Sequence, residues 1–116
     1  MSANAKPKRI VTLGAGVTET VFELGLGNAV VGVDVSSLHP PQALKKPKVG
    51  YIRMTSAEGI ASLKPDLVIA GSTLGPATVI EQLKSAGIRL ELVNTPKTID
   101  GVFARVTQIG EILNQK

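Results

Sequence analysis

The sequence contains no cysteine and no tryptophan, and it has one tyrosine and one histidine among 116 residues. The missing thiols exclude disulfides, thiolate metal sites and cysteine catalysis. With His39 alone, the chain cannot supply a histidine pair for zinc, and a Ser-His-Asp arrangement has no alternative histidine. No paired carboxylates converge in the expected loops, so hydrolytic chemistry has no evident residues. We therefore predict that the chain is not an enzyme.

Long apolar runs are also missing. No stretch approaches the roughly 20 apolar residues of a membrane-spanning helix, so we expect no direct membrane insertion. The formal net charge is +4, and much of the positive charge lies in residues 6–9 and 45–48. No stacking aromatics accompany these basic residues, which argues against nucleic-acid binding. Basic groups near a binding cleft attract an acidic ligand instead.

The sequence is rich in small and β-branched residues, and 43% of its residues are hydrophobic. Apolar runs typical of parallel strands alternate with helical patterns. The strand-like runs lie at 9–13, 30–34, 66–70 and 89–93, and the helical patterns at 17–24, 56–64, 76–86 and 99–113. This alternation predicts a three-layer, flavodoxin-like α/β domain with a four-stranded parallel sheet.

The chain length fits one globular domain. We assign residues 9–116 to this domain and residues 1–8 to a flexible N-terminal segment. Three prolines lie within residues 36–48, which we expect to form a surface excursion without regular structure. Thr18 or the preceding glycine is expected to cap the first helix, and Thr55 or Ser56 the second.

The expected ligand edge of this sheet contains the only tyrosine. Ligands of parallel sheets bind outside the carboxyl ends of the strands, where loops 14–17, 34–53 and 71–75 are expected to open. Tyr51 lies in the second of these loops, and tyrosinate is a known axial ligand of haem iron. Arg53 is two residues away, and its charge favours the phenolate form. The alternative is an ordinary exposed loop tyrosine.

Two further loops offer polar groups at this edge. Gly14-Ala15-Gly16 suggests a dinucleotide fingerprint, but Glu19 stands where the third glycine belongs and would repel a pyrophosphate. A tight turn whose amides, including those of Gly16 and Val17, line a pocket is the other interpretation. The hydroxyls of Ser72-Thr73 can donate to a ligand, or they are ordinary loop residues. A nucleotide-using, flavodoxin-like enzyme is the alternative of another class.

Short motifs continue along the chain from Arg9 to its end. They are Arg9-Ile-Val-Thr-Leu, Val17-Thr-Glu-Thr-Val-Phe-Glu-Leu-Gly, Val31-Gly-Val-Asp, Pro40-Pro41, Val49-Gly-Tyr-Ile-Arg, Ser56-Ala-Glu-Gly and Leu63-Lys-Pro-Asp-Leu-Val-Ile-Ala. Together they resemble the amino-terminal lobe of periplasmic haem-binding proteins that serve ABC importers. Several are shared with the wider cobalamin and siderophore binding group, whereas Gly-Tyr-x-Arg before Ser-Ala-Glu-Gly resembles the haem branch more narrowly.

The resemblance implies a role for three residues. Tyr51 would be an axial ligand of ferric haem, and Arg53 a partner of the tyrosine or the haem. Glu58 would dock on arginines of the ABC permease, although a first-turn carboxylate also simply stabilises its own helix. Leu38-His39-Pro40 departs from relatives, which tend to carry a tyrosine before the prolines. Cobalamin or a ferric siderophore is the alternative ligand.

The same resemblance implies a periplasmic protein with two lobes that close around the transported haem. Ala3-Asn4-Ala5 has the small-x-small form in which signal peptides end. One lobe supplies half of the cleft, so we expect Ile52, Met54 and Leu74 to be exposed there. Exposed apolar patches tend to find partners. We therefore expect self-association of the isolated lobe, with haem held between two copies through two Tyr51 residues.

Overall fold

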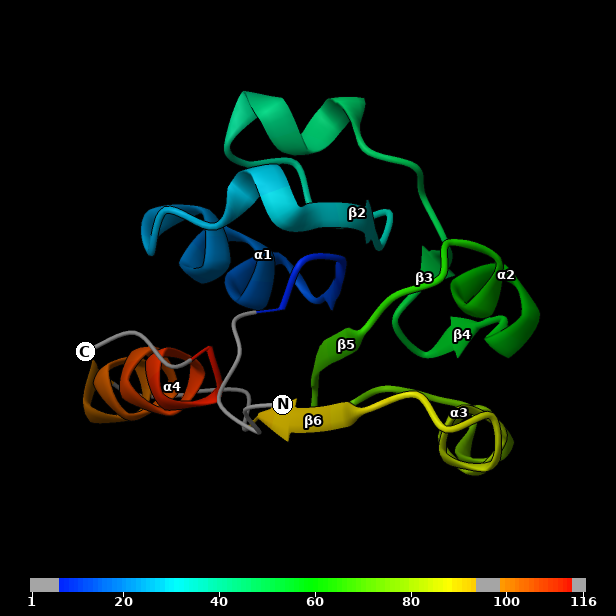
Figure 1. Ribbon diagram of the computed structural model, residues 1–116. Helices are drawn as coiled ribbons and strands as arrows, with labels where there is room; N and C mark the ends of the chain where they lie inside the picture. The colour runs from blue at the N-terminus through cyan, green and yellow to red at the C-terminus, as the bar shows by residue number, and fades with distance from the viewer. Residues whose placement is uncertain (1–6, 94–98, 114–116) are drawn as a thin grey trace.

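The computed structural model describes residues 7–93 and 99–113, apart from the side chains of residues 99–105. Its centre is a four-stranded parallel sheet with the strand order β2-β1-β5-β6 (Figure 1). The strands are β1 (Ile10–Leu13), β2 (Val30–Val33), β5 (Leu67–Gly71) and β6 (Leu90–Val93). The predicted sheet is confirmed, with every strand within one residue of its expected bounds.

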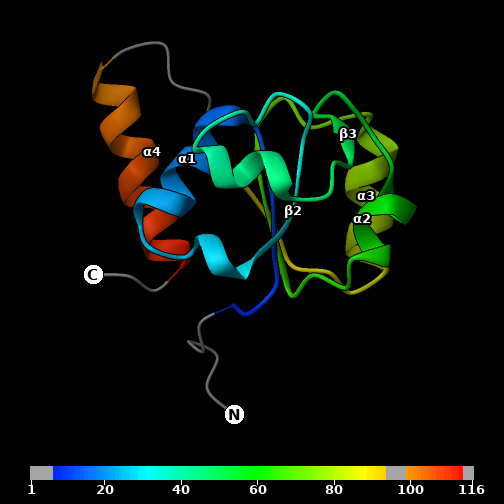
Figure 2. The same ribbon diagram turned by 90° about the horizontal axis from the view of Figure 1, so that it is seen from above.

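Helices cover both faces of the sheet, giving the predicted three layers (Figure 2). They are α1 (Ala15–Glu23) and α4 (Ile99–Ile112) on one face, and α2 (Ala57–Ser62) and α3 (Ala77–Ser85) on the other. Because strand side chains alternate between faces, Ile10 packs toward Val21 and Ile109, whereas Val11 packs toward Ile60. All of these side chains are fully buried. Within the part of the chain that the structure describes, no helix has the length and apolarity needed to span a membrane.

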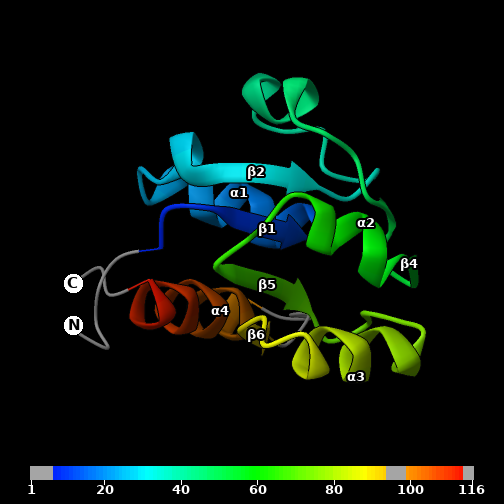
Figure 3. The same cartoon turned by 45° about the vertical axis from the view of Figure 1, so that its right-hand side comes forward.

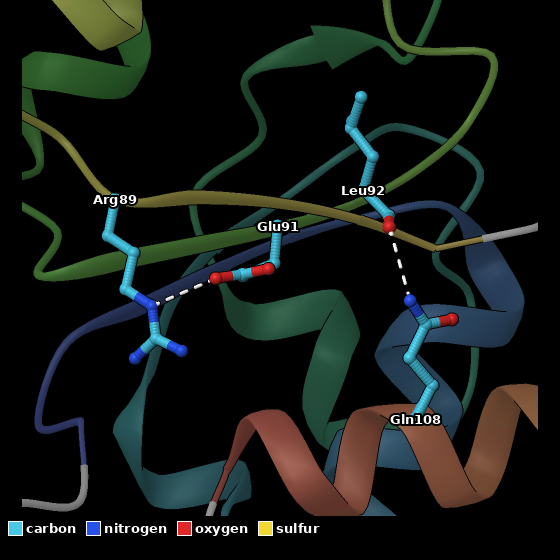
Figure 4. A network of polar contacts seen from close by, with 4 residues as sticks. All are labelled: Arg89, Glu91, Leu92 and Gln108. Atoms are coloured by element: carbon cyan, nitrogen blue, oxygen red, sulfur yellow. Dashed lines mark hydrogen bonds and ion pairs between the residues drawn. The ribbon is translucent and has the colours of Figure 1, made fainter. Parts of the chain in front are cut away.

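The outer strand β6 is tied to α4 by a side-chain contact (Figure 4). The Gln108 amide donates to the Leu92 carbonyl over 3.5 Å. An Arg89–Glu91 ion pair of 3.1 Å lies at the start of β6, with both side chains well exposed. Exposed pairs of this kind contribute little to stability, so the buried layers hold this edge.

The helix starts differ in part from the expectation. Ser56 caps α2 as predicted, with its Oγ accepting from the Gly59 N–H at 3.1 Å. Thr18 does not cap α1, because the helix begins earlier and Gly14 occupies the N-cap position. Thr18 is instead buried inside the molecule. Pro76 is the N-cap of α3 rather than its first helical residue.

The proline-containing excursion is more regular than predicted. It includes a short 3-10 helix, η2 (Pro41–Lys45), which starts with a proline whose missing N–H would have no helical partner there. The Lys48 ammonium donates to the carbonyls of Ala43, Leu44 and Lys46 at 3.0–3.3 Å. This lysine therefore holds the end of η2. A second 3-10 turn, η1 (Gly27–Ala29), precedes β2.

A two-stranded hairpin follows η2 and consists of β3 (Gly50–Tyr51) and β4 (Met54–Thr55). The chain reaches it alongside the end of β2. The Val33 N–H donates to the Pro47 carbonyl, and the Val49 N–H donates to the Val33 carbonyl, each at 2.9 Å. The hairpin is thus attached to the outer edge of the main sheet. Figure 3 shows β4 and α2 at the end toward which the sheet strands point.

Candidate functional site

Three loops meet at the carboxyl edge of the sheet, as predicted. The strand order reverses between β1 and β5, and ligands of such sheets bind at this switch point. Gly14 follows β1, and a Cβ added to it would lie 3.6 Å from Ile52 Cδ1 and 3.8 Å from the Gly71 nitrogen. The β1–α1 turn, the β3–β4 hairpin and the end of β5 therefore come together at Gly14.

Backbone hydrogen bonds fix the hairpin between its neighbours. The Val35 N–H donates to the Gly50 carbonyl at 3.0 Å. On the other side, the Gly75 N–H donates to the Ile52 carbonyl at 2.9 Å, and the Thr55 N–H donates to the Gly75 carbonyl at 3.0 Å. The hairpin is thus bonded both to the loop after β2 and to the loop after β5.

Tyr51 projects from this anchored hairpin. Its side chain is 65% exposed, and it pairs across the hairpin with Met54, which is 77% exposed. Directly paired residues in an antiparallel hairpin present their side chains on the same face. Among the described residues, no hydrogen bond engages the Tyr51 hydroxyl, so its oxygen is open to an incoming ligand. We expected Met54 to be exposed, but the sequence analysis did not include it among the ligand-binding residues.

Arg53 lies in the two-residue turn of the hairpin and is exposed. It forms no ion pair with a carboxylate in the described part of the chain, where the ion pair is Arg89–Glu91. No hydrogen bond links the Arg53 side chain to Tyr51 within that part. Closeness in sequence brings the two residues to one hairpin but does not by itself produce a contact between them.

The remaining predicted residues lie at the same edge in different settings. Gly16 and Val17 belong to the first turn of α1, whose amides have no helical acceptor. The Val17 side chain is only 3% exposed and packs in the core, so it has little surface to offer a ligand. Ser72 and Thr73 are exposed after β5. Leu74, which we expected to be exposed, is 6% exposed because it packs against α2 and α3.

A buried carboxylate behind this edge was not found from the sequence. Asp34 is 0% exposed and follows directly after β2. Its Oδ1 accepts from the Gly14 N–H at 2.9 Å and from the Ser37 hydroxyl. Its Oδ2 accepts from the Ser36 N–H at 3.3 Å and from the Ser36 hydroxyl. The sequence feature that could have identified this site is an aspartate at a strand end followed closely by two serines.

The Asp34 contacts continue into the interior as a chain of hydroxyls. Ser37 bonds to Thr18 at 2.7 Å, and Thr18 bonds to Thr12 at 2.8 Å. An ionised carboxylate can only accept, so Ser37 donates to Asp34 and must accept from Thr18. Thr18 in turn accepts from Thr12. This directional chain links β1, α1 and the turn after β2.

Two basic residues outside the hairpin, Arg9 and Lys48, donate hydrogen bonds away from it. The Arg9 guanidinium donates to the Leu63 and Lys64 carbonyls at 2.7–3.1 Å, at the end of α2. This position is at the amino edge of the sheet, opposite Tyr51. Lys48 holds η2. The charged groups of Arg9 and Lys48 therefore already donate to backbone carbonyls, and neither residue belongs to the β3–β4 hairpin.

Two surface hollows lie on the described part of the chain. A groove of about 720 Å³ runs between α1 and η2 and is lined by His39, Glu19 and Lys45 among others, but by no residue of the hairpin. A recess of about 540 Å³ lies where α2 and α3 begin, and Glu58 lines it. Among the described residues, no three histidine or acidic side chains are grouped as a metal site.

Known proteins are similar to this chain in sequence and in fold. Residues 10–116 match the family described as periplasmic binding protein. YvrC of Bacillus subtilis, an uncharacterized ABC transporter substrate-binding lipoprotein, is 41% identical over 91% of this chain and 34% of its own length. A cobalamin-binding protein of Halobacterium salinarum is 35% identical over 97% of this chain and 31% of its own.

A solved structure extends the comparison. The periplasmic heme binding protein of Pseudomonas aeruginosa superposes with a TM-score of 0.88 at 35% identity, covering 93% of this chain and 39% of that one. The chain thus spans about a third of the length of the two curated relatives. The names of these relatives include both heme and cobalamin.

Proposed function

The chain belongs to the periplasmic binding protein family, and we propose that it forms the amino-terminal lobe of a protein that binds ferric haem for delivery to an ABC importer. On this proposal the protein is periplasmic, haem is its transported ligand, and it has no enzymatic activity. The similarity to a periplasmic heme binding protein supports haem. The similarity to a substrate-binding lipoprotein supports ABC import.

The observation that supports haem most directly is the exposed, anchored Tyr51. We propose that its phenolate oxygen ligates the ferric iron, as tyrosinate does in other haem proteins. Its neighbour Met54 is the most exposed large apolar side chain among the described residues. A porphyrin face is planar and apolar, so Met54 would pack on it beside the iron ligand.

The other residues of the edge would surround the ligand. Arg53 is exposed beside Tyr51 and unpaired with any described carboxylate, so its guanidinium is suited to a haem propionate. Ser72 and Thr73 would donate hydroxyl hydrogen bonds from the loop after β5. Gly16 and Val17 would contribute backbone amides from the first turn of α1.

A haem titration of the chain tests this function. Wild-type chain with ferric haem should develop the charge-transfer band of tyrosinate-bound iron. Tyr51→Phe keeps the ring and removes the oxygen, so the band should vanish and the dissociation constant should rise at least about tenfold. Met54→Leu is the matched control, because it keeps an apolar side chain and should keep the band. An unchanged ferric spectrum in Tyr51→Phe contradicts the assignment.

A cobalamin or ferric siderophore lobe is the second candidate. The similarity to the cobalamin-binding protein of Halobacterium salinarum supports cobalamin. Parallel titrations with cobalamin and a ferric siderophore separate the two. If cobalamin or the siderophore binds saturably and haem gives no tyrosinate band, that molecule rather than haem is the ligand.

The nucleotide-using enzyme is not favoured. The Gly14 N–H already donates to Asp34, so it is not free for a phosphate, and Glu19 is exposed on α1.

We propose that Glu58 docks on the permease. It is exposed in the first turn of α2 and lines the recess at the start of α3, so an arginine side chain could enter beside it. In the intact importer, Glu58→Ala should reduce transport while haem affinity stays the same. Glu81→Ala, which removes an exposed carboxylate from α3, should leave both unchanged. A loss of haem affinity in Glu58→Ala would instead move this residue into the ligand site.

We also propose that the isolated lobe self-associates and shares one haem between two Tyr51 residues. With Leu74 buried, the apolar surface for this contact consists of Tyr51 and Met54 with half-buried Ile52. Sedimentation at high protein concentration with and without haem tests the proposal. A haem-dependent dimer is expected, and a strict monomer under both conditions rules it out.

A further inference from the structure

We infer that Asp34 is a positioning residue that sets where Tyr51 stands at the ligand edge; this inference rests on the proposed function. The carboxylate is fully buried, and its four hydrogen-bond partners are donors from Gly14, Ser36 and Ser37. No described cation pairs with it. Among the described residues its partners are therefore hydrogen-bond donors alone, one of which is the N–H at the start of α1.

The bonding path from Asp34 to the tyrosine is short. Asp34 fixes the turn that begins with the next residue, Val35, by accepting from Ser36 two residues along. The Val35 N–H then donates to the carbonyl of Gly50, the residue immediately before Tyr51. The carboxylate thus acts on the hairpin through one backbone hydrogen bond.

A second path reaches the hairpin from the opposite side. Asp34 Oδ1 holds the Gly14 N–H, and the Ile52 side chain packs over Gly14. Ile52 follows Tyr51 in the chain. Tyr51 therefore lies between Gly50 and Ile52. Gly50 is bonded to Val35, the residue after Asp34. Ile52 packs over Gly14, whose N–H donates to Asp34. A displacement of either attachment changes the position of the phenol relative to β1.

Only a carboxylate satisfies this arrangement. An asparagine would turn one of the two acceptor oxygens into an NH2 donor. In one orientation this donor faces the Ser36 N–H, and in the other it faces the Gly14 N–H. Neither backbone donor can rotate away, so the turn or the start of α1 must shift.

The test compares Asp34→Asn with Asp66→Asn at temperatures where both variants are fully folded. Asp66 is a matched control, because it also accepts two backbone N–H groups, from Lys8 and Arg9, but at the amino edge. Without ligand, Asp34→Asn should shift the amide resonances of Gly50 and Tyr51, and Asp66→Asn should not. Unmoved Gly50 and Tyr51 resonances in Asp34→Asn overturn the inference.

Ferric haem is the probe for the second measurement. Asp34→Asn should weaken haem binding about tenfold to a hundredfold, the range typical of residues that orient a metal ligand, and it should move the tyrosinate band. Asp66→Asn should retain the wild-type affinity and band. An unaltered band and affinity in folded Asp34→Asn overturn the inference.

Two further outcomes keep this inference separate from the proposed function. If wild-type chain shows no tyrosinate band but Asp34→Asn moves the hairpin resonances, the haem proposal fails and the positioning of the hairpin is retained. If Asp34→Asn does not fold, Ser36→Ala replaces it. That variant removes one hydroxyl donor to Oδ2 and keeps the carboxylate, and it should shift the same resonances by a smaller amount.

Discussion

Two aspartates hold backbone N–H groups at opposite edges of the sheet. Asp34 at the carboxyl edge is fully buried and gathers four donors from two separate segments. Asp66 at the amino edge is exposed and holds two consecutive N–H groups, those of Lys8 and Arg9. Burial therefore decides what an aspartate side chain does at each edge. At the amino edge Asp66 holds the start of β1, and at the carboxyl edge Asp34 fixes the relative position of two loops.

The strongest test of this comparison removes each carboxylate. Asp34→Ala leaves several buried donors without an acceptor, so we expect the free energy of unfolding to fall by about 3 kcal/mol or more. Asp66→Ala exposes its donors to water, and a loss of about 0.5–1 kcal/mol is expected. Urea unfolding monitored by circular dichroism measures both. Equal losses would mean that burial does not distinguish the two sites.

Two glycines with positive φ provide a second test of this contrast, with a smaller expected effect than the aspartates. Gly14 has φ 112° and ψ 131°, a region that side chains rarely adopt. Gly87 after α3 has φ 77° with open space around it. Gly14→Ala should cost about 1–3 kcal/mol, and Gly87→Ala about 1 kcal/mol. Thermal unfolding of both variants measures the difference, and a larger loss for Gly87→Ala would contradict it.

The smallest expected effect concerns two buried threonines of α1. Thr18 joins the hydroxyl chain that ends at Asp34, whereas the Thr20 hydroxyl only donates back to the Gly16 carbonyl of its own helix. Thr18→Val should therefore lower the free energy of unfolding by about 1–2 kcal/mol. Thr20→Val should change it little, because this local bond competes with the helix rather than supporting it. Chemical denaturation of the pair measures this, and an equal cost would remove the distinction.

Much of the fold could be predicted from the sequence because it depends on local patterns. The four apolar runs form the strands of the sheet, with every residue of β1 and β5 buried. Ser56 caps α2 within its own helix turn. The regular η2 turn was missed because it depends on Lys48, whose ammonium contacts carbonyls up to five residues away. Prolines alone predicted the break in regular structure but not the side chain that stabilises the turn.

The candidate site was predictable only where topology determines it. Tyr51 lies at the carboxyl edge because parallel strands bring their following loops together there. The Asp34 chain depends on contacts among Thr12, Thr18 and Ser37 that no sequence period encodes. Leu74 was misjudged for a related reason. Its loop position suggested exposure, while its side chain reaches the core beneath α2 and α3.

The attachment of residues 47–50 to β2 determines how the tyrosine can move. Val33 bonds to this segment through both its N–H and its carbonyl, and Val35 continues the ladder to Gly50. A loop tied in this way has no hinge of its own, because hinge residues must be free to change their backbone angles. We therefore expect Tyr51 to move together with the sheet. On the proposed function, closure around haem would then require displacement of the whole domain, on the slower timescale of domain motion, rather than movement of this hairpin alone.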